Sequence, residues 1–243
     1  MEKRKALIVR GGWEGHEPIQ VSLRYKQMLE EENFDVEISD TLDAYLDYDH
    51  INNLDLIVPL WTGGELNNEQ TKGVSEAVGR FGVGLAGNHG GMCDSFRTNV
   101  EWQFMTGAQW VSHPGGYVDY DVYIAKTSSP ITEGLNDFHV PNTEQYYIHI
   151  DPACEILATT QYPYSANYYH AANGHVHVPV VMTKRWGHGR VFYNTLGHTN
   201  PVFDIYEARE MMRRGFLWAA EGKRIFRETN ADPDKYVSNK KMY

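Results

Sequence analysis

The sequence predicts an α/β domain built on a mostly parallel sheet with helices on both faces. In the first half of the chain, short apolar runs alternate with stretches of helical spacing in the order β-α-β-α-β. One of these runs, LDLIVPL at Leu54–Leu60, is almost continuously apolar, as expected for a strand buried on both faces. No proline-rich, glycine/serine-rich or repetitive stretch divides the 243 residues, which favours one domain.

The first half is expected to hold four strands and two helices. The expected strands are Lys5–Val9, Phe34–Ile38, Leu54–Leu60 and Val83–Ala86. Helices are expected after the first and third strands, where apolar residues recur every three or four positions: Val21, Tyr25, Met28 and Leu29, then Thr71, Val74, Val78 and Phe81. The fourth strand runs directly into a glycine-rich segment, after which we expect a further helix.

The second half is richer in strands and ends in a helix. Strands are expected at Tyr117–Ala125, Tyr146–Ile150, Glu155–Thr160, Val178–Thr183 and Arg190–Leu196. The last two flank a WGHG turn and should form a hairpin. A final helix carries apolar residues through Ala219, so we place the domain at 1–222 and a polar tail at 223–243. This tail is either loose or laid on a neighbouring subunit, and the chain is a candidate homo-oligomer.

Composition excludes several classes of partner. The net charge of −10 repels phosphate backbones, so nucleic acid is not expected as a partner. No apolar run approaches the roughly 20 residues of a membrane span, and the first run, Ala6–Val9, is too short for a signal peptide. Two cysteines cannot build a disulfide framework, so a cytoplasmic location is the simplest expectation.

Polar residues gather in segments at or near the ends of expected strands. Because ligands of open parallel sheets bind beyond the carboxyl ends of the strands, these segments are expected to converge. They are GGWEGHEP with His16, GNHGG with His89, TEQYYIH with Glu144 and His149, and LGHT with His198. Imidazoles with a carboxylate suit Zn²⁺ or a similar divalent ion. Most of the 11 histidines are expected to be ordinary surface or hydrogen-bonded residues.

The GNHGG segment is the most specific of these signals. Small residues on both sides of one functional residue, between a strand and a helix, are typical of a nucleophile elbow, which here would present His89. Cys93 is the rival nucleophile, but it lies one helical turn further on and is expected to be a buried structural cysteine. His113 is expected mainly in a turn. No HExxH or CxxC spacing is present, so local motifs alone do not indicate a metal site.

The same segments resemble the trehalose-utilisation (ThuA-like) family from about Lys5 to Gly222. The stretches that carry the resemblance are ALIVRGGWEGHEP, GVGLAGNHGGMCDSFR, EWQFMTGAQWVSHPGG, PITEGLNDF, TEQYYIHIDP, EILATT and GHGRVFYNTLGH. It implies the fold of the class I glutamine amidotransferase-like superfamily, a flavodoxin-like three-layer α/β/α domain. Those amidotransferases carry a cysteine in the elbow and a histidine after a later strand. Here His89 fills the elbow and His198 stands near the later histidine, which argues against glutaminase activity.

The resemblance also implies an enzyme of disaccharide catabolism that acts on 3-keto derivatives of trehalose or related sugars. A ketone at C3 acidifies the C2 proton, so elimination, enolisation or isomerisation would begin with the same proton abstraction. We expect His89, His198, Glu144 and His149 as catalytic candidates, with His16, His89, His198 and Glu144 as metal ligands. Trp13, Tyr146 and Asn88 are expected to hold the sugar, and no nucleotide cofactor is expected. The alternatives are a non-catalytic sugar-binding or regulatory protein and a Cys93-dependent hydrolase.

Overall fold

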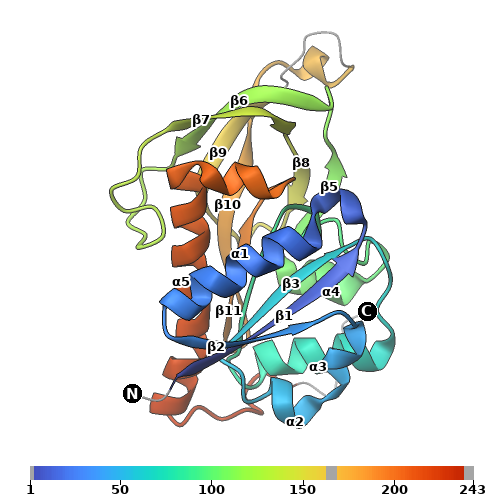
Figure 1. The fold of residues 1–243 in the computed structure, drawn as a ribbon, viewed down its shortest axis with the longest axis vertical. Helices are drawn as coiled ribbons and strands as arrows, with labels where there is room; N and C mark the ends of the chain where they lie inside the picture. The colour runs from blue at the N-terminus through green and yellow to red at the C-terminus, as the bar shows by residue number, and fades with distance from the viewer. Residues whose placement is uncertain (1–2, 163–168, 238–243) are drawn as a thin grey trace.

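A computed structural model describes residues 3–162 and 169–237 and shows one large sheet with helices packed on it (Figure 1). Within these ranges the sheet has nine strands. In spatial order they are β2 (Phe34–Ser39), β1 (Arg4–Gly12), β3 (Leu56–Thr62), β4 (Gly84–Asn88), β11 (Gly189–Asn194), β10 (Val176–Trp186), β9 (Glu155–Tyr162), β6 (Tyr117–Ile124) and β7 (Phe138–Glu144).

One half of the sheet is parallel, as the sequence predicts. Strand β1 pairs in parallel with β2 and β3, and β4 pairs in parallel with β3 and β11. The carboxyl ends of these five strands therefore meet at one edge of the sheet. Most of these strands are short apolar runs, because helices pack on both faces of this part of the sheet.

The other half of the sheet is antiparallel. Strands β10 and β11 form the predicted hairpin, and β10, β9, β6 and β7 continue with antiparallel pairings. The sheet is thus mixed, with the parallel order confined to β2, β1, β3, β4 and β11. Strand β7 was not expected from the sequence. Neither was β5 (Ala108–Ser112), which pairs with β8 (Tyr147–Ile150) in a separate two-stranded sheet.

Two apolar cores cover the two faces of the sheet. Along β1, Ala6 and Ile8 belong to one core, and the alternate residues Leu7 and Val9 belong to the other. The first core includes apolar residues of α1 (Pro18–Glu31) and α5 (Tyr206–Glu228). The second includes residues of α3 (Asn68–Gly79) and α4 (Val100–Thr106), with the short helix α2 (Tyr48–Ile51) beside α3 (Figure 1). This arrangement matches the prediction of helices on both faces.

Two regions differ from the sequence-based expectation. The glycine-rich segment after β4 leads into a single 3₁₀ turn, His89–Gly91, and the next helix, α4, begins only at Val100. The last helix, α5, continues past Gly222 to Glu228. The described part of the tail lies against its own chain, because Asp234 pairs with Arg80 at 2.6 Å.

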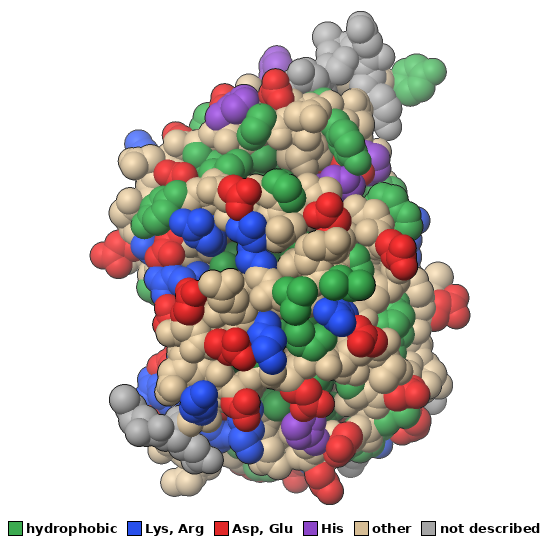
Figure 2. Space-filling model, in the orientation of Figure 1, with side chains coloured by type: hydrophobic (Ala, Val, Ile, Leu, Met, Phe, Trp, Pro, Cys, Tyr) green, Lys and Arg blue, Asp and Glu red, His purple; other side chains and the backbone are tan. Residues whose placement is uncertain are grey.

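The surface around α1 and α5 mixes charges of both signs, and acidic and basic side chains are interspersed on the face that Figure 2 shows. On α5, for example, Glu210 pairs with both Arg213 and Arg214. Within the described ranges, no helix combines the length and apolar character that a membrane crossing requires.

Candidate metal centre

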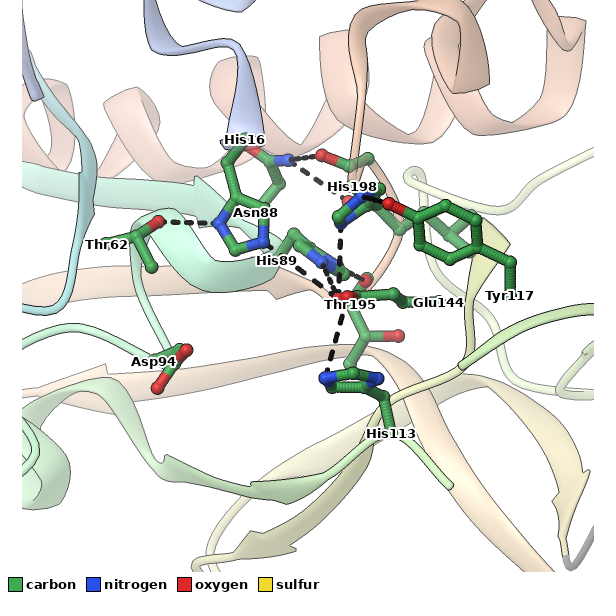
Figure 3. Close-up of polar contacts among 12 residues, drawn as sticks. His16, Thr62, Asn88, His89, Asp94, His113, Tyr117, Glu144, Thr195 and His198 are labelled. Carbon is green, nitrogen blue, oxygen red and sulfur yellow. Dashed lines mark hydrogen bonds and ion pairs between the residues drawn. The ribbon is translucent and has the colours of Figure 1, made fainter. Parts of the chain in front are cut away.

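The structure brings four of the predicted site residues together at the carboxyl edge of the parallel strands (Figure 3). His16 ends the 3₁₀ turn Glu14–His16 that follows β1, and His89 begins the turn that follows β4. His198 lies in the loop after β11, and Glu144 is the last residue of β7. We call these four residues the His–Glu cluster.

The inner atoms of the cluster point toward one another. Glu144 Oε2 lies 3.1 Å from His89 Nε2, 3.2 Å from His198 Nδ1 and 4.0 Å from His16 Nε2. One ligand atom from each of the four residues falls within 4.8 Å of all the others. Three imidazole nitrogens and a carboxylate oxygen are a donor set that Zn²⁺ commonly takes in proteins.

The outer nitrogen of each histidine is held by a separate partner. His16 Nδ1 lies 2.7 Å from Thr62 Oγ1, and His89 Nδ1 lies 2.7 Å from the Thr195 carbonyl oxygen. His198 Nε2 lies 2.8 Å from the Tyr117 hydroxyl. Such outer partners fix the tautomer and orientation of histidines that bind a metal.

The protonation of His89 favours a cation inside the cluster. Because its Nδ1 faces a carbonyl oxygen, this nitrogen must donate, which leaves Nε2 of the neutral ring as a lone pair facing Glu144 Oε2. Burial lowers the pKa of His89, outweighing the opposing hydrogen bond with Glu144, so the neutral ring is favoured. A lone pair against a carboxylate is repulsive unless a cation lies between them.

Two further observations fit the same ion. His198 Nδ1 is buried without a hydrogen-bond partner among the described residues, although Glu144 lies close to it. Burial, reinforced by the neighbouring rings of His89 and His198, lowers the pKa of His16 to about 2. Burial would raise the pKa of Glu144, but its contacts with His198 and His89 outweigh this and lower it. Neutral histidines and an ionised carboxylate are the protonation states that bind a metal.

The backbone around His89 is shaped for close approach. His89 has a φ of +45°, which non-glycine residues adopt rarely. The next residue, Gly90, packs against the ring of His16 so tightly that a Cβ there would lie 2.3 Å from His16 Cε1. The glycine is therefore required for the two histidines to approach each other. The elbow expected from the sequence is present as a strained turn, although no helix follows it directly.

A cavity of about 470 Å³ opens beside the cluster, and its lining includes His16 and Glu144. Its volume falls within the range of roughly 300–1,000 Å³ that is usual for small-molecule sites. Tyr146 lines it and stacks on His89 with ring centroids 3.8 Å apart. Trp13 also lines it, with 55% of its surface exposed, and its ring meets that of His16 edge to face. Both aromatic residues expected to hold a sugar thus face this cavity.

His113 joins the site more closely than the sequence suggested. It lies in the turn after β5, and its Nε2 is 3.5 Å from Glu144 Oε1. The three histidines of the cluster lie closest to the other carboxylate oxygen, Oε2. Thr62 and Tyr117 also went unnoticed in the sequence. Nothing in the local pattern marks either one, because Thr62 simply ends a buried strand and Tyr117 begins an alternating one.

Two predicted site residues take other places. His149 is exposed on β8 and lines a different cavity, since it alternates with the buried Ile148. Asp151, two residues further on, pairs with Lys184 at 2.6 Å. The structure therefore does not bring His149 to the cluster, where a catalytic role was expected for it.

Asn88 is buried and does not line the cavity beside the cluster. Its side-chain amide donates to the carbonyl oxygens of Leu196 and Gly197, at 3.1 and 3.2 Å. It thus anchors the loop that carries His198, and this geometry gives no support to the expectation that Asn88 contacts the sugar.

Cys93 does not have the surroundings of a nucleophile. It is only 4% exposed, and burial raises the pKa of its thiol well above the ordinary value. No helix carries it, contrary to the sequence-based expectation, but its backbone amide donates to the His89 carbonyl. It acts as packing beneath the elbow, consistent with the expectation of a buried structural cysteine.

Comparison with known proteins gives a family and a fold. The family model ThuA, described as trehalose utilisation, matches residues 5–219 of this chain. The search of curated proteins found no significant match.

Several solved structures are similar over almost the whole chain. A protein from Parabacteroides merdae described as ThuA-like is 21% identical, with a TM-score of 0.69 and 91% of each chain covered. A second ThuA-like protein, from Bacteroides uniformis, is 17% identical with a TM-score of 0.69, covering 95% of this chain and 94% of the other. A glutamine amidotransferase from Thermotoga maritima is 14% identical with a TM-score of 0.52, covering 96% and 88%. At these identities the similarity shows the fold, an α/β architecture related to the amidotransferases.

Proposed function

This chain belongs to the ThuA family, and from that premise we propose that it is a metal-dependent enzyme acting on 3-keto derivatives of trehalose or related disaccharides. The His–Glu cluster would hold a divalent ion, Zn²⁺ being the one its donors suit best. We assign the fold more finely to the flavodoxin-like three-layer α/β/α class. A cytoplasmic location is part of the proposal, since Cys93 and Cys154 are both free thiols.

The observation that carries the proposal is the arrangement of the three clustered histidines. Each presents one nitrogen to Glu144 and has the other fixed by an outside partner. An ordinary buried histidine needs only one such partner, whereas a ligand needs its free nitrogen oriented. A bound divalent ion would supply Lewis acidity toward a sugar oxygen at the edge of the cavity.

The residues of the chain account for substrate binding. Trp13 presents exposed aromatic surface to the cavity, which suits the apolar face of a sugar ring, and the buried Tyr146 forms part of the cavity wall. Tyr146 cannot tilt freely because it stacks on His89, so it would fix the depth of the reacting ring.

The reaction would begin with transfer of the C2 proton to a group on the cavity wall beside the cluster, where His113 lies. The electron pair of the broken C2–H bond would then form the enolate of the C3 ketone. In an elimination, the C1–O bond to the second sugar breaks next, and that sugar leaves as an alcohol after taking up a proton. Enolisation and isomerisation share the first step and differ only in where a proton returns.

Metal content and turnover test this proposal together. The purified protein should carry about one equivalent of a divalent metal by elemental analysis and should consume a 3-keto-disaccharide. His89→Ala and His198→Ala should lose the metal and the turnover. His149→Ala, which changes an exposed histidine outside the site, is the matched control and should keep both.

Other outcomes separate the alternatives. Full metal occupancy in His89→Ala and His198→Ala would remove these residues from the ligand set. Sugar binding with neither metal nor turnover would favour a binding protein. Cys93→Ala should retain turnover, and a loss by several orders of magnitude would favour a thiol-dependent hydrolase.

A further inference from the structure

A second polar group lines the cavity apart from the metal ligands. Asp94 follows the elbow and forms an ion pair with Arg97 through the guanidinium Nε. The Asp94 backbone is fixed because its carbonyl accepts a hydrogen bond of 2.9 Å from the Gly63 amide. In Figure 3, no dashed line joins Asp94 to the His–Glu cluster. Its position is therefore set by the chain and not by the cluster.

Arg97 is held from two directions while its outer nitrogens stay free. Its guanidinium carbon lies 4.4 Å from the centre of the Trp110 ring, and its Nε donates a hydrogen bond to Asp94 Oδ1. Within the described part of the chain, neither its Nη1 and Nη2 nor Asp94 Oδ2 makes a hydrogen bond. Two donors and an acceptor are thus presented side by side on the cavity wall. Such a set matches two neighbouring hydroxyls of a sugar.

Aromatic rings connect this pair to the metal ligands. Tyr146 stacks on His89, the Trp110 ring lies 6.2 Å from that of Tyr146, and Arg97 covers Trp110. The pair and the cluster therefore line the same cavity and are linked along its wall by these two aromatic rings. A disaccharide whose reacting ring lies at the cluster could extend its second ring along this wall toward Arg97.

The charges around the cavity favour an uncharged ligand. Away from Glu144, whose charge a bound ion would offset, the lining carries the carboxylates of Glu65 and Asp94 against the single guanidinium of Arg97. A phosphorylated sugar would meet this excess of negative charge, whereas neutral hydroxyls can use Arg97 and Asp94 without a Coulombic penalty.

We propose that Asp94 and Arg97, supported by Trp110, form a subsite for the second, non-reacting ring of an unphosphorylated disaccharide. The inference rests on the proposed function for the location of the reacting ring. It makes Arg97 a specificity determinant that separates disaccharides from monosaccharide glycosides.

Calorimetric binding of unreactive sugars tests the subsite without needing turnover. Trehalose, sucrose and lactose serve as disaccharide probes, and methyl α-glucoside serves as the one-ring probe. At least one disaccharide should bind the wild type more tightly than the glucoside does. Arg97→Ala and the near-isosteric Asp94→Asn should weaken that disaccharide roughly ten- to hundredfold and leave glucoside binding within about threefold. Trehalose 6-phosphate should bind more weakly than trehalose.

Arg185→Ala is the control, because Arg185 is an exposed arginine on β10 outside the cavity lining. It should bind every probe like the wild type, and thermal melts should show that all variants fold. Equal binding of one-ring and two-ring sugars by the wild type, or an Arg97→Ala variant that keeps the preference, would overturn the subsite. So would the absence of disaccharide binding. Absence of metal and turnover with the preference intact would overturn the proposed function alone.

Discussion

Each clustered histidine presents one ring nitrogen to Glu144 and the other to an outside partner. These outside partners lie on or next to separate strands. Thr62 ends β3, Thr195 follows β11 and Tyr117 begins β6. The geometry of the ligand atoms therefore depends on strands that lie far apart in sequence. This is why local spacing such as HExxH does not reveal the site.

Replacing Tyr117 by Phe should weaken metal binding without unfolding the protein. The change removes the hydroxyl 2.8 Å from His198 Nε2 and leaves a side chain that is 57% exposed, so little packing is lost. Loss of such an outer partner costs roughly 10–100-fold in metal affinity. Competition with a chelator measures it, and Tyr123→Phe on the same strand is the control. Unchanged affinity in Tyr117→Phe would show that this contact does not orient His198.

Sequence reasoning located the cluster residues but not every neighbour. His16, His89 and His198 could be found because each lies beside glycine, and the first two of these segments follow strands of a recognisable parallel order. His149 could not be excluded, because the facing of a strand depends on its partner. The pairing of β8 with β5 turns Ile148 inward and His149 outward. Asn88 ends β4 next to His89, but its side-chain amide donates to the loop that carries His198 and not toward the cavity.

At the scale of elements, apolar runs predicted the parallel strands well. The central strands β3 and β4 are buried on both faces, so their residues are almost all apolar or small, whereas β2 alternates buried and exposed positions. Strand β7 was not predicted because its sequence, FHVPNTE, contains proline and several polar residues. Such a composition is tolerated because the strand lies at the edge of the sheet. The helix expected after the elbow was wrong. Gly90 and Gly91 form the 3₁₀ turn, and Phe96 adopts a φ of +48°, which interrupts helical geometry.

The packing of α5 on β11 leaves no room for a methyl group at Gly215. A Cβ there would lie 2.4 Å from Cε1 of Phe192, which is fully buried. Alanine gains up to about 1 kcal/mol in helix propensity, while overpacking costs about 1–3 kcal/mol. We expect Gly215→Ala to lower the free energy of unfolding in urea denaturation.

Gly79→Ala in α3 is a useful comparison, because its Cβ would approach Trp186 only to 3.2 Å. That variant should change stability less than Gly215→Ala does. A Gly215→Ala protein more stable than the wild type would mean that helix propensity outweighs packing at this interface.

At the scale of the whole molecule, the buried cluster should make the metal-free protein sensitive to acid. The pKa of His16 falls from 6.5 to about 2 on folding, because burial and neighbouring imidazoles disfavour its charged form. Between these values the unfolded chain binds a proton that the folded chain does not, so stability falls as the pH drops below about 6.5. The lowered pKa of Glu144 acts in the same direction. Its contribution is present above its ordinary pKa of 4.5 and is lost as the pH falls toward the folded value.

We therefore expect the melting temperature in the presence of EDTA to decrease steadily from pH 7 to pH 4.5. Within that interval the histidines whose pKa is lowered by burial, His16 and His89, are the groups that titrate in the unfolded chain. His16→Gln removes one of them and should show a shallower decrease over the same interval. Parallel curves for the two proteins would contradict the assignment of a neutral, buried His16.

The central claim is that His16, His89, His198 and Glu144 bind one divalent ion. Anomalous diffraction at the zinc absorption edge, from crystals grown with zinc, tests it most directly. The account predicts one peak about 2.0–2.2 Å from the inner nitrogens of the histidines and from a Glu144 oxygen. A cluster that shows no peak, or only a water bonded to His198 Nδ1, would contradict it.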